Sequence, residues 1–417
     1  MRIEALTDSV AEKFLAVRRR SDLAAERVAA KIIADVRRRG DAALFAWTRR
    51  LDRRKLTADT LWIDSGERRA ALRQVSPGLR MALEHAARNI RRVAEKQRPR
   101  SWSMIVEPGV RVGQRVTPLD AIGCYVPGGR FSLVSTLLMT VVPAQVAGVE
   151  RIVVACPRPN LAVLAAAELL GVKEIAHMGG AQAIAALAYG TKSLPRVDKI
   201  FGPGNRYVTA AKGLVSADCA LDMLAGPTEV LIVATRGVPR HIAADLVAQA
   251  EHDPDAVALL VTTSRTLATE VRDAVGERLS ALPPTNLARQ SLSRNGAILI
   301  ARNTASAVRF ANAFAPEHLS IPGGETALVK GLRTAGSFFV GPWSAQSIGD
   351  YASGTNHVLP TGGGARSRGG LSTWDFVRCA TVQQLSRGGL RSLAPVVAEL
   401  ADAEGLAAHK SAVEVRL

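Results

Sequence analysis

Side chains suited to acid–base or metal chemistry lie in the second half of the sequence. Gln249 and His252 are three residues apart on a predicted helix over 241–252, so both face one side and could touch one ion. That spacing is common by chance, and no HExxH motif accompanies it. Glu317 stands directly before His318, and neighbouring side chains on a strand or in a turn face different ways. The pair could serve two separate proton transfers, or it could belong to a solvated loop.

Three more histidines, His177, His357 and His409, lie in different sequence surroundings. Asp350 and His357 belong to one turn-rich run, and His409 follows Glu404 near the end of the chain. Because these groups lie far apart in sequence, spacing alone does not define a zinc site. His177 ends an apolar strand and is interpreted as a core histidine.

The cysteines favour a structural role. Cys124 and Cys156 follow or end predicted strands, and a thiolate at either could attack an aldehyde. Neither has a His or Lys nearby in sequence to lower its pKa, so both are interpreted as small buried side chains. Four cysteines without paired spacing indicate reduced thiols rather than a disulfide framework.

Three glycine-rich turns mark possible phosphate sites. They span Gly123–Gly129, Gly179–Ala183 and Phe201–Asn205, each before a predicted helix. Ligands of doubly wound folds bind at the carboxyl ends of strands, and helix-opening amides suit a pyrophosphate. None of the turns is a complete dinucleotide fingerprint. In the run that begins at Gly202, for example, Tyr207 stands where the third glycine belongs. Each turn could equally be structural, but three in one unit favour a nucleotide-type ligand.

The elements around these residues alternate between strand and helix from Asp120 onward. Residues 1–100 are predicted to be helical, and helices are again predicted after about Leu371, at 381–387, 392–399 and 404–412. The middle of the chain forms two α/β units in series that meet near 224–227, with parallel sheets covered by helices. Their strands are predicted at 150–155, 174–177, 198–201, 229–234, 256–262, 297–301 and 337–340.

The overall composition excludes several classes of protein. The net charge is +17, and residues 1–100 hold 25 basic and 13 acidic side chains, which we interpret as solvated helix faces rather than a nucleic-acid site. The longest uncharged apolar stretch, 137–149, is too short for a membrane span. The acidic N-terminus does not resemble a secretory signal, so we expect a cytoplasmic protein.

Eight sequence runs together resemble histidinol dehydrogenase, in order and in spacing from about residue 20 onward. The runs are Tyr125–Gly129, Gly179–Thr191, Asp198–Asn205, Ala225–Glu229, Gln249–His252, Pro316–Leu319, Gly349–Thr361 and Glu404–His409.

The resemblance implies an enzyme that oxidises L-histidinol to L-histidine in two steps, each reducing one NAD, with zinc as the metal. It assigns the acid–base roles to Glu317 and His318. It places NAD contacts on Tyr125, Gln182 and Asn205. The zinc ligands it implies are Gln249, His252, Asp350 and His409, and the substrate contacts are Thr228, Gln249, His252, His318, Asp350, Glu404 and His409.

The resemblance also implies a fold and an assembly. The fold is two incomplete Rossmann-like domains, doubly wound and mostly parallel, with small helical N- and C-terminal pieces. A homodimer is implied, in which the C-terminal tail reaches the partner's site. The implied segments are a helical piece of 1–20 and 372–396, a domain of 21–124 and 228–371 with the active-site residues, an NAD-binding domain of 125–227, and a tail of 397–417.

Two positions depart from the family pattern. Thr228 replaces the usual Ser, which keeps a hydroxyl but adds a methyl beside the substrate, and Arg130 stands where a small residue is commoner. Related dehydrogenases of other small alcohols, such as sulfopropanediol, share the scaffold and are the alternative. Glu404 and His409 favour histidinol, a cationic substrate. A more distant alternative is an inactive relative that binds RNA through the basic N-terminal segment.

Overall fold

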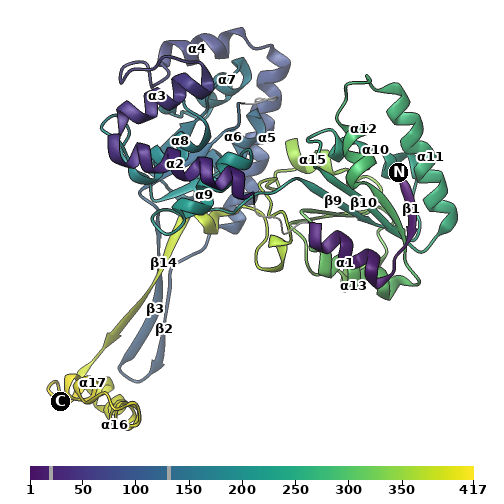
Figure 1. Ribbon diagram of the computed structural model, residues 1–417. Helices are drawn as coiled ribbons and strands as arrows, with labels where there is room; N and C mark the ends of the chain where they lie inside the picture. The colour runs from purple at the N-terminus through teal and green to yellow at the C-terminus, as the bar shows by residue number, and fades with distance from the viewer. Residues whose placement is uncertain (18–21, 129–132) are drawn as a thin grey trace.

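The computed structural model describes residues 1–17, 22–128 and 133–417; Gly129 and Arg130, named above, lie outside these ranges. The described chain forms two α/β bodies and a projecting arm (Figure 1). Within these ranges, no helix combines the length and the apolar composition that crossing a membrane requires.

The first body is built on a five-stranded parallel sheet, sheet B, with the order β6-β5-β4-β7-β8. Both faces of the sheet are buried by helices, as an all-parallel sheet requires. Its strands are β4 (Ala121–Tyr125), β5 (Arg151–Ala155), β6 (Glu174–Ala176), β7 (Lys199–Phe201) and β8 (Ala220–Leu221). Its helices are α2 (Leu23–Arg39), α3 (Asp41–Asp52), α4 (Ser65–Gln74), α5 (Pro77–Gln97), α6 (Val134–Ala147), α7 (Leu161–Leu169), α8 (Gly180–Tyr189) and α9 (Arg206–Val215).

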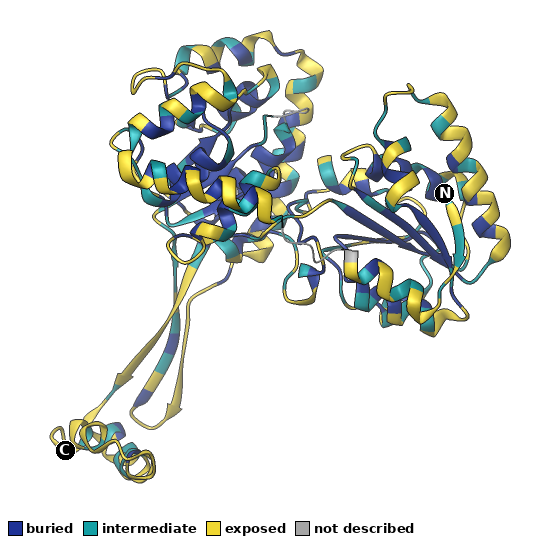
Figure 2. Cartoon of the chain, viewed as in Figure 1, coloured by how far each residue is buried: buried dark blue, intermediate teal, exposed yellow. Residues whose placement is uncertain are grey.

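The second body contains a six-stranded parallel sheet, sheet A, with the order β1-β11-β10-β9-β12-β13. Its central strands are dark blue throughout in Figure 2, because helices cover both faces. The strands are β1 (Arg2–Ala5), β9 (Glu229–Val233), β10 (Val257–Thr262), β11 (Ala297–Ile300), β12 (His318–Ile321) and β13 (Ser337–Val340). The helices are α1 (Asp8–Val17), α10 (Pro239–Ala250), α11 (Arg265–Ala281), α12 (Ala288–Asn295), α13 (Thr304–Phe314), α14 (Thr326–Gly331) and α15 (Gln346–Tyr351), and short 3-10 turns follow at Gly364–Arg366 and Thr373–Phe376.

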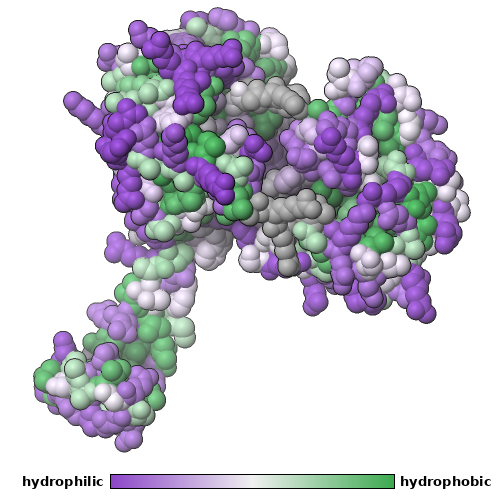
Figure 3. Space-filling model, viewed as in Figure 1, coloured by the Kyte–Doolittle hydropathy of each residue, from purple (hydrophilic) through white to green (hydrophobic). Residues whose placement is uncertain are grey.

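The arm is a three-stranded antiparallel sheet that carries two helices at its tip (Figure 1). Large apolar side chains are exposed along it, among them Trp102 and Ile105. Figure 3 shows hydrophobic residues in green along the arm, next to hydrophilic ones in purple. The arm consists of β2 (Trp102–Glu107), β3 (Val110–Pro118), β14 (Val377–Leu385), α16 (Arg387–Glu404) and α17 (Ala407–Glu414).

The predicted fold class, two doubly wound and mostly parallel α/β domains, is confirmed, but two local expectations are wrong and two strand-forming segments were missed. The start of the chain is not only helical, because β1 pairs with β11 at the edge of sheet A. The helix predicted at 381–387 is wrong, because residues 381–385 belong to β14, which pairs with β3, and helix α16 begins only at Arg387. The strands at 102–118 and at 318–321 were not predicted. β2 is exposed along its whole length, and β12 has only four residues, all buried, so neither strand has one buried and one exposed face.

The N-terminal helices belong to a different body from the one expected. Residues 21–124 were grouped with 228–371, but Ile32 of α2 and Leu44 of α3 pack in one core with Val153 of β5 and Ile184 of α8, in the first body. Residues 1–17 likewise join sheet A instead of forming a separate piece with 372–396. Long-range packing decides these groupings, and local sequence patterns carry no signal for it.

Candidate active site

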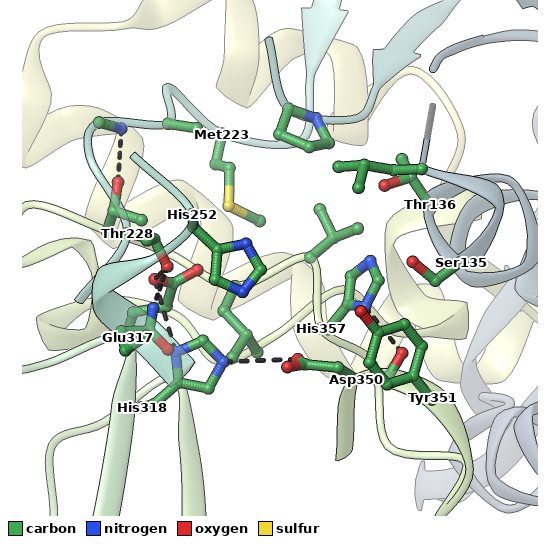
Figure 4. A pocket seen from close by; sticks show the side chains of 18 residues that line it. Ser135, Thr136, Met223, Thr228, His252, Glu317, His318, Asp350, Tyr351 and His357 are labelled. Carbon is green, nitrogen blue, oxygen red and sulfur yellow. Dashed lines mark hydrogen bonds and ion pairs between the residues drawn. The ribbon is translucent and has the colours of Figure 1, made fainter. Parts of the chain in front are cut away.

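A pocket of about 190 Å³ lies between the two bodies and is lined by residues from both (Figure 4). The first body contributes the segments that follow the strands of sheet B, including Ser135, Pro203 and Met223. The second body contributes Thr228 directly before β9, together with Glu317 and His318 at the beginning of β12. The pocket therefore joins the carboxyl edge of sheet B to the amino edge of sheet A. The rule that ligands bind at the carboxyl ends of strands thus describes the first body but not the second.

Glu317 is held by the strand beside it. β9 and β12 are neighbours, with Val230 opposite His318, so Glu317 lies close to Thr228 and Glu229. One carboxylate oxygen, Oε2, accepts hydrogen bonds from Thr228 Oγ1 at 2.5 Å and from the Glu229 amide at 2.8 Å. The side chain is buried, so these two bonds fix its position and compensate part of its desolvation.

His318 lies between two carboxylates. Its Nδ1 is 3.1 Å from the Glu229 carbonyl oxygen, which only accepts, so Nδ1 carries the hydrogen. Its Nε2 is buried and lies 3.7 Å from Asp350 Oδ1, and it has no hydrogen-bond partner among the described residues. Burial lowers the pKa of His318, but Glu317 and Asp350 raise it more, and the net pKa is about 10. Nε2 is therefore the ring atom available to a ligand (Figure 4).

Thr228 connects Gln249 to Glu317. Gln249 lies in the last turn of α10, and its Nε2 donates a hydrogen bond to Thr228 Oγ1. The Thr228 hydroxyl in turn donates to Glu317, so both functions of that hydroxyl are used within the protein. Because the amide nitrogen of Gln249 is engaged with Thr228, its amide oxygen is the atom that can bind another ligand.

His252 and Asp350 line the same pocket as Gln249. Burial raises the pKa of Asp350, but the nearby charge of His318 outweighs burial and keeps that pKa below its usual value. Asp350 is therefore an anionic donor that faces the pocket. Both Gln249 and His252 lie at the C-terminal end of α10, where the helix dipole favours a cation.

His409 and Glu404 are not in this pocket. Both are exposed on the helices at the tip of the arm, away from the two bodies (Figure 1). In the described parts of the chain, no group of three or more His, Cys, Asp or Glu side chains is placed to hold a metal ion. The pocket of one subunit contains three of the four predicted zinc ligands, namely Gln249, His252 and Asp350.

The predicted NAD residues lie on the first body, at the carboxyl edge of sheet B. The hydroxyl of Tyr125 accepts a hydrogen bond from the Gly180 amide at 3.1 Å, and Tyr125 is buried. Gln182 is fully buried in the first turn of α8. Asn205 is exposed and caps α9 through its side-chain oxygen. None of the three lines the pocket described above.

Sequence reasoning missed several residues of the pocket, His357 above all. His357 Nδ1 lies 3.0 Å from the Asp350 carbonyl oxygen, and burial lowers the pKa of its ring. The turn-rich run that contains Asp350 was the available signal, but no role was assigned to this histidine. Ser135, Thr136 and Tyr351 also line the pocket; Tyr351 lies in the same run as Asp350, whereas Ser135 and Thr136 carried no sequence signal.

Cys124 and Cys156 are buried, and burial raises the pKa of each thiol to about 12. A thiol with so high a pKa is not a thiolate near neutral pH. This agrees with their interpretation as packing residues.

Two parallel α/β bodies with a buried carboxylate–imidazole pair in the pocket between them define an α/β enzyme built for proton transfer. The family model for histidinol dehydrogenase matches residues 16–417. The chain belongs to the histidinol dehydrogenase family, which confirms the resemblance.

Similar proteins support this membership along the whole chain. The chain is 47% identical to the histidinol dehydrogenase of Methanothermobacter thermautotrophicus over 396 residues, covering 93% of this chain and 92% of the relative. It is 48% identical to that of Geobacillus kaustophilus over 394 residues, covering 93% and 92%. The crystal structure of histidinol dehydrogenase from Elizabethkingia anophelis superposes with a TM-score of 0.94 at 36% identity, covering 100% of this chain and 97% of that one.

Proposed function

We propose that this chain oxidises L-histidinol to L-histidine through L-histidinaldehyde, in two successive NAD-dependent steps that complete histidine biosynthesis. Family membership favours histidinol over other small alcohols and over an RNA-binding role. The observation that carries the proposal is the buried pair Glu317 and His318, each fixed by a backbone group of Glu229 within the pocket.

Although burial lowers the pKa of His318, Glu317 and Asp350 raise it more and favour a protonated ring in the free protein. We propose that a cation bound beside Asp350 lowers this pKa again, so that Nε2 loses its proton and accepts the proton of the alcohol. Nδ1 is engaged with the Glu229 carbonyl, so the ring orientation is fixed before substrate arrives. The nearby carboxylates of Glu317 and Asp350 stabilise the imidazolium that forms. The same nitrogen can return the proton to solvent between the two steps.

Glu317 is proposed to act in the second oxidation. Oxidation of an aldehyde to an acid requires water to add to the carbonyl carbon, and that water must lose a proton. Thr228 and Glu229 hold Oε2, which leaves the other carboxylate oxygen to accept this proton. Because Glu317 is fixed in place, the water it activates has a defined direction of attack.

A zinc ion fits the donor chemistry of the pocket. Gln249, His252 and Asp350 offer oxygen and nitrogen donors, which zinc accepts, and His409 of a second copy would complete four ligands. When bound, NAD accepts the hydride of each step, and zinc orients the imidazole and the amine of histidinol. Glu404 would then face the cationic substrate, together with Thr228 at the opposite end of the site.

NAD is proposed to bind at the carboxyl edge of sheet B, near Tyr125, Gln182 and Asn205. The amide oxygen of Gln182 is buried and has no hydrogen-bond partner among the described residues. An unpaired buried acceptor of this kind suits a ligand that brings a donor.

We propose a homodimer with shared active sites. His409 and Glu404 are exposed at the end of an arm whose strands also expose Trp102 and Ile105. Exposed apolar side chains of this size on a projecting element suit burial against a second copy. The partner would thus receive the two residues that one chain cannot supply to its own pocket.

We also propose that the enzyme acts in the cytoplasm, where NAD is available. The cysteines Cys124, Cys156, Cys219 and Cys379 are all free, which suits a reducing compartment.

The test is the yield of NADH from a limiting amount of L-histidinol. Two equivalents of NADH per substrate are expected, with L-histidine as the product. One equivalent with accumulation of aldehyde would contradict the four-electron reaction. Dialysis against a chelator is expected to abolish the activity, and added zinc to restore it. Full turnover by metal-free protein would contradict the zinc assignment.

A further inference from the structure

Asp52 and Gln182 meet at the carboxyl edge of sheet B, although they are 130 residues apart in sequence. Asp52 is the last residue of α3, and Gln182 lies in the first turn of α8. Gln182 Nε2 donates a hydrogen bond of 3.1 Å to Asp52 Oδ2. The end of α3 is itself held in place, because Arg158, in the loop after β5, donates a hydrogen bond of 2.9 Å to the Asp52 carbonyl.

This bond determines which end of the Gln182 amide is left over. An amide nitrogen only donates and an ionised carboxylate only accepts, so Asp52 fixes the NH₂ end toward itself. The other end, Oε1, is buried and unpaired among the described residues. An alanine at position 182 would avoid an unpaired buried acceptor. This chain has Gln182 instead, and the hydrogen bond to Asp52 fixes the direction of its amide group.

Gly180 provides the space beside that oxygen. A Cβ on Gly180 would lie 2.6 Å from Gln182 Oε1, and the residue has a φ of +63°, which favours glycine. The Gly180 amide is bound by the Tyr125 hydroxyl. Tyr125 and Gln182, which are both proposed to contact NAD, therefore lie next to the same glycine. Asp52 holds Gln182 through the hydrogen bond to its amide nitrogen.

We infer that Asp52 is a positioning residue for the cofactor, which holds the Gln182 amide so that its oxygen faces an O–H or N–H donor of NAD. The inference rests on the proposed function. A ribose hydroxyl or the nicotinamide carboxamide has such a donor. The pyrophosphate is not protonated near neutral pH and has no donor, so it does not suit this oxygen. The Gly179–Gly180 turn thus takes a polar, uncharged part of the cofactor.

The experiment is a double-mutant cycle on NAD affinity, measured by calorimetry on the full-length protein without histidinol. The proteins are the wild type, Asp52→Ala, Gln182→Ala and the double variant. Asp52→Ala is expected to weaken NAD binding about 5- to 10-fold, and Gln182→Ala at least as much. Because Asp52 acts through Gln182, the double variant is expected to bind no more weakly than Gln182→Ala alone.

Steady-state kinetics gives a second readout. The KM for NAD of Asp52→Ala is expected to rise with its dissociation constant, while the KM for histidinol is retained. Asp59→Ala removes the same charge at an exposed position seven residues further along the chain and serves as the matched control. Asp52→Asn keeps an oxygen acceptor and the side-chain size, so it is expected to bind NAD more tightly than Asp52→Ala, and it replaces that variant if the latter fails to fold.

The outcomes separate this inference from the proposed function. If Gln182→Ala leaves NAD affinity unchanged, the NAD contact assigned to Gln182 is wrong. If Gln182→Ala weakens binding but Asp52→Ala does not, or if the two losses add in the double variant, the positioning role of Asp52 is wrong.

Discussion

The two sheets present opposite edges to the pocket, and each edge works in a different way. Sheet A contributes the amino ends of β9 and β12, where Thr228 donates a hydrogen bond to Glu317, and Glu317 and His318 are each bonded to the backbone of Glu229. Sheet B contributes its carboxyl edge, with glycine-rich turns and helix beginnings. Reactive side chains at one edge are held by neighbouring strands, whereas the other edge offers backbone and amide groups to a ligand. The proposed acid–base residues and the proposed cofactor contacts therefore lie on different bodies.

The arm differs from both edges, because the residues it carries have no contact with the pocket of their own chain. Glu404 lies at the end of α16 and His409 lies in α17, and both side chains are exposed. The comparison therefore predicts that changes at the sheet A edge act within a subunit and that changes on the arm act between subunits.

The largest effect is expected at the sheet A edge. His318→Ala should lower the rates of alcohol and aldehyde oxidation by about 10²- to 10⁴-fold, because it removes the proton acceptor of each step. Glu317→Gln should reduce aldehyde oxidation more than alcohol oxidation, since only the former needs an activated water. Both half-reactions can be followed by NADH formation from histidinol and from histidinaldehyde. Equal losses in the two half-reactions for Glu317→Gln would contradict the separate roles.

The arm is tested by mixing two inactive variants. His318→Ala and His409→Ala are denatured and refolded together in equal amounts. If the tail reaches the partner's site, each mixed dimer has one site with both lesions and one with neither. About a quarter of all sites should then regain activity under two-fold symmetry. A mixture that stays inactive, although both proteins refold and mix, would show that the tail serves its own subunit.

A smaller effect is expected at Thr228, which joins Gln249 to Glu317. Thr228→Val keeps the shape but removes the hydroxyl, so kcat/KM should fall about 10-fold as both partners lose a bond. Thr228→Ser retains the hydroxyl and is the matched control, with activity expected within about twofold of the wild type. Zinc content, measured after dialysis, should fall in the Val variant only. Equal behaviour of Ser and Val variants would mean that these bonds do not matter.

The smallest effect is expected at His177, a buried histidine at the edge of sheet B. Its pKa is lowered, whereas the pKa of His318 is raised. Burial, and then the charge of Arg54, lower the pKa of His177 to about 4. Between this pKa and the ordinary value of 6.5, the unfolded chain binds a proton that the folded chain does not. His177 should therefore be neutral for stability above pH 6.5 and destabilise the fold progressively as the pH falls toward 4.

The measurement is urea unfolding at pH 7.5 and pH 5 for the wild type and for His177→Gln. The wild type should lose more free energy of unfolding than the variant between these pH values, by roughly 1–2 kcal/mol because partial solvation reduces the effect. His85→Gln, which changes an exposed helical histidine, is the control. An equal loss in wild type and His177→Gln would contradict the lowered pKa.

The sequence alone determined the parts of this protein that depend on local order. Buried parallel strands are short apolar runs between turns, so β5, β7, β9 and β13 were predicted to within about a residue at each end. The pair Glu317 and His318 and the helix carrying Gln249 were recognisable as well, because adjacent residues stay adjacent in any fold.

Only the tertiary structure decided which distant segments meet. It joined β1 to sheet A, placed the helices of residues 22–97 on sheet B, and paired β14 with β3 in an arm whose exposed strands lack a buried face. It also placed Thr228 against Glu317, and Asp52 against Gln182. These contacts depend on which helix packs on which sheet and on strand order. Both are set by the burial of apolar surface across the whole chain, and no local pattern of residues encodes them.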